Sequence, residues 1–151
     1  MARISKDDYF INIAIESAKR GTCSRRSVGC VLIDSIDHIL STGFNGNAHG
    51  QPHCIDKPCV GALHPSGEGL DDCESIHAEI NAIVHCRDIQ SIVKCYTTLS
   101  PCVSCVKALL ASPCQEIIFL EEYPHSKSKE LWENSGRKWN HHKRNTILKL
   151  I

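Results

Sequence analysis

The spacing of apolar residues predicts an amphipathic helix near the start of the chain, over residues 5–20. Phe10, Ile13 and Ala14 lie three and four positions apart, so they share one face of a helix. Gly21 follows this pattern and marks the end of the helix. A helix with one apolar face packs on a core, so this segment is expected to cover one side of the fold.

The rest of the chain alternates between short apolar runs, typical of buried strands, and segments with helical spacing. Strands are expected over residues 28–33, 39–44, 92–99, 116–120 and 146–151. Helices are expected over residues 76–87, 101–111 and 126–134. Such alternation predicts an α/β fold, specifically a three-layer α/β/α sandwich with a mixed central sheet of about five strands.

Residues 45–74 interrupt this alternation. The segment is rich in glycine and proline and has no hydrophobic period. A structureless insert of about thirty residues is unusual inside a small domain, so something must order it. Its metal-binding side chains are Cys54, Cys59, Cys73, His53 and His64.

Composition narrows the class of protein. Residues 1–151 are predicted to form a single domain, because the length is near the commonest domain size and 42% of the residues are hydrophobic. The 17 basic and 17 acidic residues cancel, which argues against a nucleic-acid partner. The sequence shows no signal-peptide core and no apolar run of membrane-spanning length. We therefore expect a cytoplasmic location and no membrane partner.

Cysteine is unusually frequent, with ten cysteines beside nine histidines. Disulfides and metal sites are the two interpretations, and disulfides need an oxidising compartment. A cytoplasmic location favours metal ligation. Four of the cysteines lie in or next to expected helices and strands and are predicted to be small apolar core residues; these are Cys30, Cys86, Cys95 and Cys114.

Two of the predicted helices begin with metal-binding residues. His77 opens one, and Cys102 and Cys105 lie at the start of the other, with a spacing of three that places both thiols on one face. One histidine and two thiolates leave one position of a tetrahedral zinc site open, as in catalytic sites. Glu79, two positions after His77, could handle a proton beside that open position. H-x-E followed by P-C-x-x-C is the signature of zinc-dependent nucleobase deaminases.

On these motifs the chain resembles the deoxycytidylate (dCMP) deaminases of the cytidine deaminase superfamily. The matching stretches occur in the family's order and are residues 22–29, 43–46, 53–54, 77–82 and 100–105. Phe44 departs from the pattern, because the family commonly has tyrosine at this position.

The resemblance implies zinc-dependent hydrolysis of dCMP to dUMP and ammonia, which supplies dUMP for thymidylate synthesis. His77, Cys102 and Cys105 would bind the catalytic zinc. Glu79 would accept a proton from the attacking water, pass it to ring N3, and then protonate the departing amino group.

The residues predicted to contact the substrate are Asn45, Arg25, Arg26, Ala78, Ser100 and Tyr123. By resemblance, Asn45 is expected to hydrogen-bond the sugar and cytosine region. Arg25 or Arg26 is expected to meet the 5′-phosphate, which needs a cation. Ser100 would offer its carbonyl to the exocyclic amine, and Tyr123 would close the pocket.

Members of the family often carry a second, structural zinc, and Cys23 and Cys54 match positions used for it. The remaining ligands differ between branches of the family. Cys59 and Cys73 are predicted here, with His53 and His64 as the alternatives. Four thiolates would close such a site and order the insert. Free surface thiols are the competing interpretation.

The resemblance further implies activation by dCTP with Mg²⁺, inhibition by dTTP, and assembly as a hexamer. The effector site is expected at Gly43, Phe44, Asn45 and Gly46.

Other functions remain open at this point. A tRNA adenosine deaminase would share the zinc core but should have a basic surface, and a free-cytidine deaminase should lack the arginines and the insert. A zinc-stabilised interaction module is the alternative from another class. Glu79 argues against it, because a closed structural site has no use for a carboxylate there.

Overall fold

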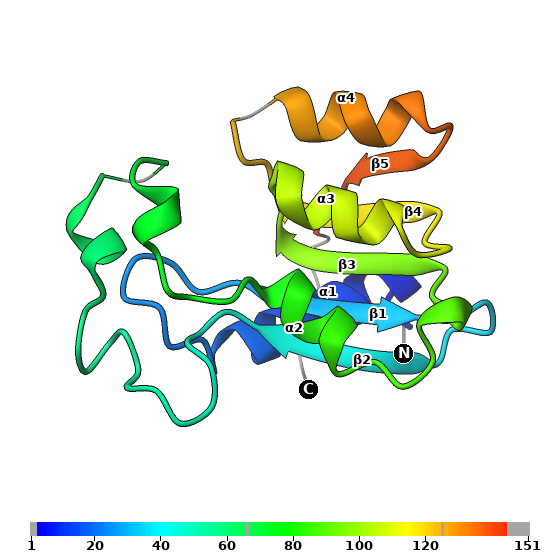
Figure 1. Ribbon diagram of the computed structural model, residues 1–151. Coiled ribbons are helices and arrows are strands. Elements are labelled where there is room, and N and C mark those ends of the chain that lie inside the picture. Colours follow the sequence, from blue (N-terminus) through cyan, green and yellow to red (C-terminus); the bar gives the residue numbers. More distant parts are fainter. Residues whose placement is uncertain (1–2, 66, 125, 145–151) are drawn as a thin grey trace.

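A computed structural model describes residues 3–65, 67–124 and 126–144 of the chain (Figure 1). Its longer elements are α1 (Lys6–Ala18), β1 (Gly29–Ile33), β2 (Ile39–Phe44), α2 (Ala78–Val84), β3 (Lys94–Leu99), α3 (Val103–Leu110), β4 (Glu116–Glu121), α4 (Ser126–Asn134) and β5 (Lys138–His141). Three short 3-10 helices complete the set, and these are η1 (Val60–Leu63), η2 (Leu70–Asp72) and η3 (Ile89–Ser91).

The described strands form one five-stranded sheet in the order β2-β1-β3-β4-β5. β1 pairs antiparallel with β2 and β3, whereas β3, β4 and β5 pair in parallel. Figure 1 shows α1 behind the sheet and α2, α3 and α4 in front of it. The predicted three-layer sandwich with a mixed sheet is therefore confirmed.

The core divides into two clusters because side chains alternate across β1. Val31 and Ile33 pack with Phe10 and Ala14 of α1 on one face of the sheet. Leu32 points to the opposite face and packs with residues of α2, α3 and α4, namely Ala78, Ala82, Val106, Leu109 and Trp132. All five residues of β1 are buried, as expected for a strand covered on both faces.

The fifth strand does not lie where the apolar pattern placed it. β5 is formed by Lys138–His141, in a stretch that reads as basic and polar, and the strand predicted over residues 146–151 falls outside the described residues. β5 is an edge strand with mostly exposed side chains, so it carries no alternating pattern. Its packing comes from two rings against Phe119, because Trp139 and His141 each lie 5.1 Å from that ring between centroids.

The insert over residues 45–74 contains only the 3-10 helices η1 and η2 among its described residues. Its base is closed by an isolated antiparallel bridge between Gly46 and Ile76, directly before α2. The rest therefore depends on side chains for order. Within the described part of the chain, no helix is long and apolar enough to cross a membrane.

Arg137 caps the C-terminal end of α3, the helix that carries two of the candidate ligands. Its guanidinium donates hydrogen bonds to four backbone carbonyls at that end, those of Leu109, Leu110, Ser112 and Cys114, at 2.8–3.3 Å. The guanidinium also lies 5.2 Å from the centroid of the buried Trp132 ring. One cation thus satisfies the carbonyls that a helix end leaves without partners and joins α3 to α4.

We predict that Arg137→Ala lowers the free energy of unfolding by about 2–3 kcal/mol, because the half-buried carbonyls lose a charged donor. Urea unfolding of the variant and the wild type measures the difference. Arg87→Ala, which removes an exposed arginine after α2, is the control and should change stability by less than about 0.5 kcal/mol. Equal losses in the two variants would contradict the capping role.

Candidate active site

The three candidate ligands lie at the starts of two helices that face each other across the front of the sheet. His77 is the N-cap residue of α2, and Cys102 is the N-cap residue of α3. Cys105 is the third residue of α3. A backbone hydrogen bond from Ser100 N to Glu121 O, 2.8 Å long, ties the chain before α3 to the end of β4. The parallel pair β3 and β4 therefore fixes where α3 begins.

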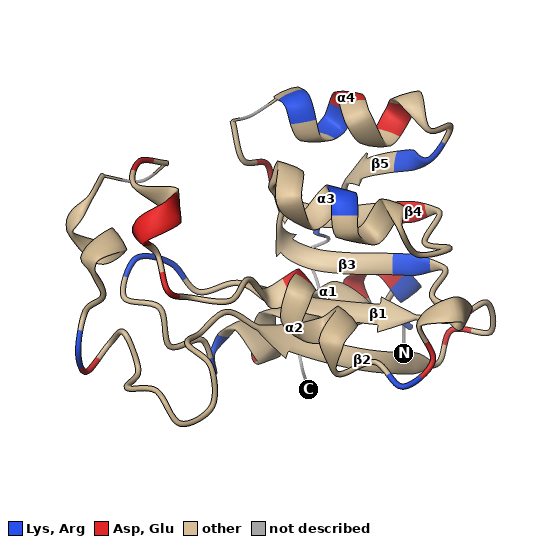
Figure 2. Ribbon diagram, in the orientation of Figure 1, with Lys and Arg blue, Asp and Glu red and all other residues tan. Residues whose placement is uncertain are grey.

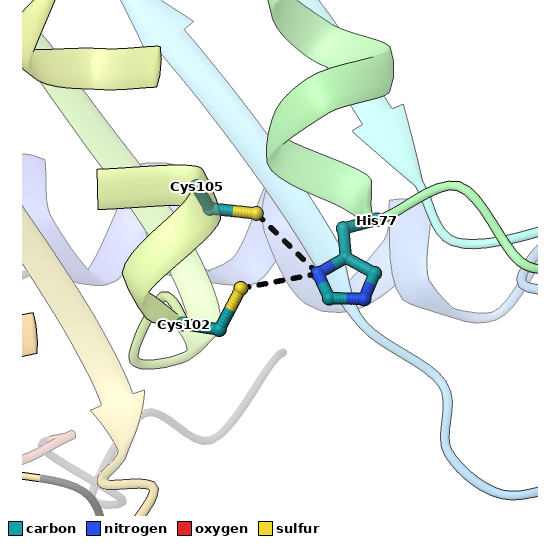
Figure 3. Close-up of side chains that lie close together, drawn as sticks. All are labelled: His77, Cys102 and Cys105. Carbon is teal, nitrogen blue, oxygen red and sulfur yellow. Dashed lines mark hydrogen bonds between the residues drawn. The ribbon is translucent and has the colours of Figure 1, made fainter. Parts of the chain in front are cut away.

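His77, Cys102 and Cys105 converge on one point (Figure 3). His77 Nδ1 lies 3.4 Å from the Sγ atom of Cys102 and 3.4 Å from that of Cys105. The three ligand atoms all lie within 4.8 Å of one another, and among the described residues no other group of three does so. The cysteines and histidine predicted to share a metal are thus brought together.

The donor atoms fit zinc. An imidazole nitrogen and two thiolates are ligands that zinc prefers. Zn–S bonds of about 2.3 Å and Zn–N bonds of about 2.0 Å would place tetrahedral ligand atoms about 3.5 Å apart. The observed separations of 3.4 Å between nitrogen and sulfur match this spacing without rearrangement.

The two thiols have different acidities. Contact with the Cys105 thiol and with His77 lowers the pKa of Cys102 to about 4, despite partial burial. Contact with Cys102 and burial raise the pKa of Cys105 well above its usual range. The contact with Cys102 also raises the pKa of His77. A thiolate is therefore available at Cys102 at neutral pH, and a metal cation would favour the second.

Glu79 is the carboxylate of this site. It is the second residue of α2, is only 4% exposed, and interacts with the Cys105 thiol. Burial raises the pKa of its carboxyl above the ordinary value. A carboxyl of raised pKa beside a metal site is better suited to take up and release a proton than one of ordinary pKa.

Ala78 and Gly43 lie at the close contact between α2 and β2. Ala78 is buried, and a Cβ built on Gly43 would lie 2.2 Å from the Ala78 carbonyl oxygen. Only glycine permits this approach. Asn81 strengthens it by donating its side-chain Nδ2 to the Phe44 carbonyl oxygen at 2.8 Å.

Asn45 binds the loop that follows α1. Its Nδ2 donates to the Arg26 carbonyl oxygen at 2.6 Å, and its Oδ1 accepts from the Val28 backbone nitrogen at 2.8 Å. The side chain is buried, at 7% exposure. The amide thus holds the loop that carries the two candidate arginines, and its contact with a substrate stays a prediction.

The two arginines of that loop have different surroundings. Arg25 is half-buried and donates to carbonyl oxygens of the insert. Arg26 is exposed, and its guanidinium lies 5.9 Å from the centroid of the Tyr123 ring. Arg25 thus already has backbone partners, whereas Arg26 is exposed; that either arginine meets a phosphate stays a prediction. Nothing in the sequence distinguishes the two neighbours.

Ser100 and Tyr123 are joined, although they lie on different loops. Ser100 is buried, and its Oγ accepts a hydrogen bond of 2.6 Å from the Tyr123 backbone nitrogen. Ser100 lies two residues before Cys102, so Tyr123 is fixed close to the ligand cluster. The segment Gly43–Gly46, predicted to bind effectors, lies at the end of β2 and at the base of the insert.

The four cysteines predicted to bind a second zinc are not brought together as a group: among the described residues, only His77, Cys102 and Cys105 lie close enough for three ligands to share one metal. All ten cysteines of the chain are described and are free thiols. Cys54 and Cys59 are buried, with 3.8 Å between their Sγ atoms. Burial raises the pKa of the Cys73 thiol, and the Cys23 and Cys59 thiols raise it further. His64, one of the alternative ligands, instead pairs with Asp72 at 3.1 Å.

Comparison with known proteins gives the relatives of this chain. Residues 4–121 match the family model for the cytidine and deoxycytidylate deaminase zinc-binding region. ComE operon protein 2 of Bacillus subtilis is 32% identical over 142 residues, which cover 90% of this chain and 70% of that protein. Deoxycytidylate deaminase of Mycobacterium phage D29 is 30% identical over 129 residues, which cover 81% of this chain and 99% of that protein.

The chain spans much less of some relatives. Deoxycytidylate deaminase of Schizosaccharomyces pombe is 30% identical over 125 residues, which cover 80% of this chain and 38% of that protein. Among solved structures, the dCMP deaminase of cyanophage S-TIM5 has a TM-score of 0.71 at 19% identity, and the match covers 93% of this chain and all of that one. Its complex with dCMP and dUMP has a TM-score of 0.69. These likenesses confirm the predicted cytidine deaminase-like fold.

Proposed function

Because the chain belongs to the cytidine and deoxycytidylate deaminase family, we propose that it hydrolyses dCMP to dUMP and ammonia and so supplies dUMP for thymidylate synthesis. The observation that carries the proposal is the cluster of His77, Cys102 and Cys105 beside the buried carboxyl of Glu79. Relatives named deoxycytidylate deaminase, and a similar fold solved with dCMP and dUMP, support this choice of substrate.

In this proposal each residue of the cluster has a role. His77, Cys102 and Cys105 would hold zinc, which supplies a water of lowered pKa when bound. Glu79 accepts the proton of the attacking water and delivers it to cytosine N3. The water oxygen forms a bond to C4. Glu79 then takes the remaining proton from the C4 hydroxyl and passes it to the amino group. The C4–N bond breaks, C4 keeps the oxygen as a carbonyl, and ammonia leaves. Burial suits Glu79 to this exchange because it raises the pKa of the carboxyl.

Arg26 is the proposed ligand of the 5′-phosphate. Its guanidinium is exposed and is supported by the face of the Tyr123 ring. Figure 2 shows basic and acidic residues interspersed along the ribbon in this view, and the 17 basic and 17 acidic residues of the sequence give no basic excess of the kind typical of polynucleotide-binding proteins. A mononucleotide with one phosphate fits this distribution better than tRNA does.

We further propose that Cys23, Cys54, Cys59 and Cys73 bind a structural zinc, with His53 or His64 as alternative ligands. The contact between Cys54 and Cys59 supports this, as does the lowered pKa of Cys54. Burial opposes ionisation of Cys54, but hydrogen bonds from Ser24 and Cys59 outweigh it and bring the pKa to about 7. Such a site would join the loop after α1 to the insert.

Regulation and assembly follow the family pattern in this proposal. dCTP with Mg²⁺ would activate and dTTP would inhibit, through the segment Gly43–Gly46, in a hexamer located in the cytoplasm. The free state of all ten cysteines is compatible with a reducing compartment. Turnover of dCMP with and without each triphosphate tests the regulation.

Glu79→Gln is predicted to retain zinc and to lose at least about 100-fold in kcat for dCMP, because the amide cannot carry the proton. The loss of cytosine absorbance measures turnover. Glu74→Gln, at an exposed glutamate of the insert, should keep the wild-type rate. Retention of more than a tenth of the wild-type rate by Glu79→Gln would contradict the assigned role.

Arg26→Ala is predicted to raise the KM for dCMP by about 10- to 100-fold, which is the loss of one charged hydrogen-bonding partner. Deoxycytidine has no phosphate, so its kcat/KM should stay the same. Parallel kinetics on the two substrates separate these effects. An equal loss for both substrates would show that Arg26 does not read the phosphate.

Metal analysis should find about two zinc ions per wild-type chain, one for each proposed site. Cys105→Ala and Cys54→Ala should each retain about one, and only the first should lose all turnover. Cys86→Ala, which removes a buried thiol outside both sites, is the control and should keep about two. A wild-type content of one zinc would remove the structural site from the proposal.

A further inference from the structure

Arg25 holds together three points of the insert. Its guanidinium donates to the carbonyl oxygens of Gly61 at 2.8 Å, Pro65 at 2.9 Å and Glu68 at 3.4 Å. These carbonyls belong to a segment that contains only short 3-10 helices and has few other backbone partners among its described residues. One planar, permanently charged group with several donors is well suited to this task.

The part of the insert that Arg25 binds contacts Tyr123. A Cβ built on Gly67 would lie 3.1 Å from the Tyr123 hydroxyl oxygen, so the backbone of Gly67 lies next to the phenol. Gly67 lies between two of the carbonyls that Arg25 binds and has a φ of +86°, which side chains rarely adopt. The position of this backbone against Tyr123 therefore depends on the hydrogen bonds that Arg25 donates.

Tyr123 connects the insert to the candidate active site. Its backbone is hydrogen-bonded to Ser100, two residues before the ligand Cys102. The face of its ring supports Arg26, the exposed cation proposed for the phosphate. A continuous series of contacts thus runs from Arg25 through the insert to Tyr123 and back to Arg26, the next residue in the chain.

We infer that Arg25 is a positioning residue for recognition of a nucleoside 5′-monophosphate. By holding Gly67 against Tyr123, Arg25 fixes the ring on which the Arg26 guanidinium lies. It thereby sets the preference for the phosphorylated over the unphosphorylated nucleoside without touching either one. This inference rests on the proposed deamination of dCMP and on Arg26 as the phosphate ligand.

Kinetics of the full-length, zinc-loaded protein on dCMP and deoxycytidine test the inference. Arg25→Ala is expected to raise the KM for dCMP by about tenfold, with kcat and the kcat/KM for deoxycytidine unchanged within about twofold. Arg25→Lys should restore only part of the preference, because an ammonium lacks the planar set of donors. Arg87→Ala, at an exposed arginine outside the insert, is the control and should have the wild-type KM and kcat for both substrates.

A substitution at Tyr123 interrupts the same series of contacts without removing the hydrogen bonds that Arg25 makes to the insert. Tyr123→Leu should also raise the KM for dCMP, and the double variant with Arg25→Ala should be no worse than the stronger single variant. Additive losses would overturn the inference, since the two residues would then act separately.

Two other outcomes would also overturn it. An unchanged preference for dCMP in Arg25→Ala excludes the positioning role. An equal loss on both substrates, with a fall in zinc content, would show that Arg25 only supports the folded insert. If the wild type does not deaminate dCMP, the proposed function itself fails and this inference fails with it. By contrast, if the wild type deaminates dCMP and Arg25→Ala has the same preference for dCMP, only the inference about Arg25 fails.

Discussion

The close approach of two helix N-termini is the constraint on which the candidate site depends. His77 and Cys102 are N-cap residues, so their positions are set by where α2 and α3 begin. Gly43 seats α2 on the sheet at a distance that no side chain would allow. Arg137 binds the opposite end of α3. Because helix N-termini also favour thiolates, the same geometry that brings the ligands together prepares one of them for a metal.

Features that are local in sequence could be predicted. The spacing of His77 and Glu79, and of Cys102 and Cys105, specifies side chains within one or two helical turns, and the structure brings His77 and both cysteines together as expected. Strand β5 was not predicted, because an exposed edge strand needs no apolar alternation. Its position depends on parallel pairing with β4 and on ring contacts with Phe119, neither of which leaves a pattern in Lys138–His141.

Contacts with backbone carbonyls were the least predictable part of the site. Arg25 and Arg26 are identical residues in adjacent positions, yet one binds carbonyls of the insert and the other lies over an aromatic ring. Asn45 likewise uses its amide to bind the backbone of the loop that carries them. A carbonyl acceptor is present at every residue, so no motif marks the one that is used. Sequence motifs therefore predict the side chains that carry the chemistry more reliably than they predict the residues that hold those side chains in place.

The ten cysteines show how environment divides a single residue type. Contact with Cys95 tends to lower the pKa of Cys30, but burial and the nearby charge of Glu79 outweigh it and raise that pKa. Contact with Cys30 and burial raise the pKa of Cys95 further. These core thiols stay neutral beneath the site, whereas contact with Cys105 and His77 makes Cys102 a thiolate. Glu79 contributes to this difference, since its nearby charge adds to burial in disfavouring ionisation of Cys30 and Cys95.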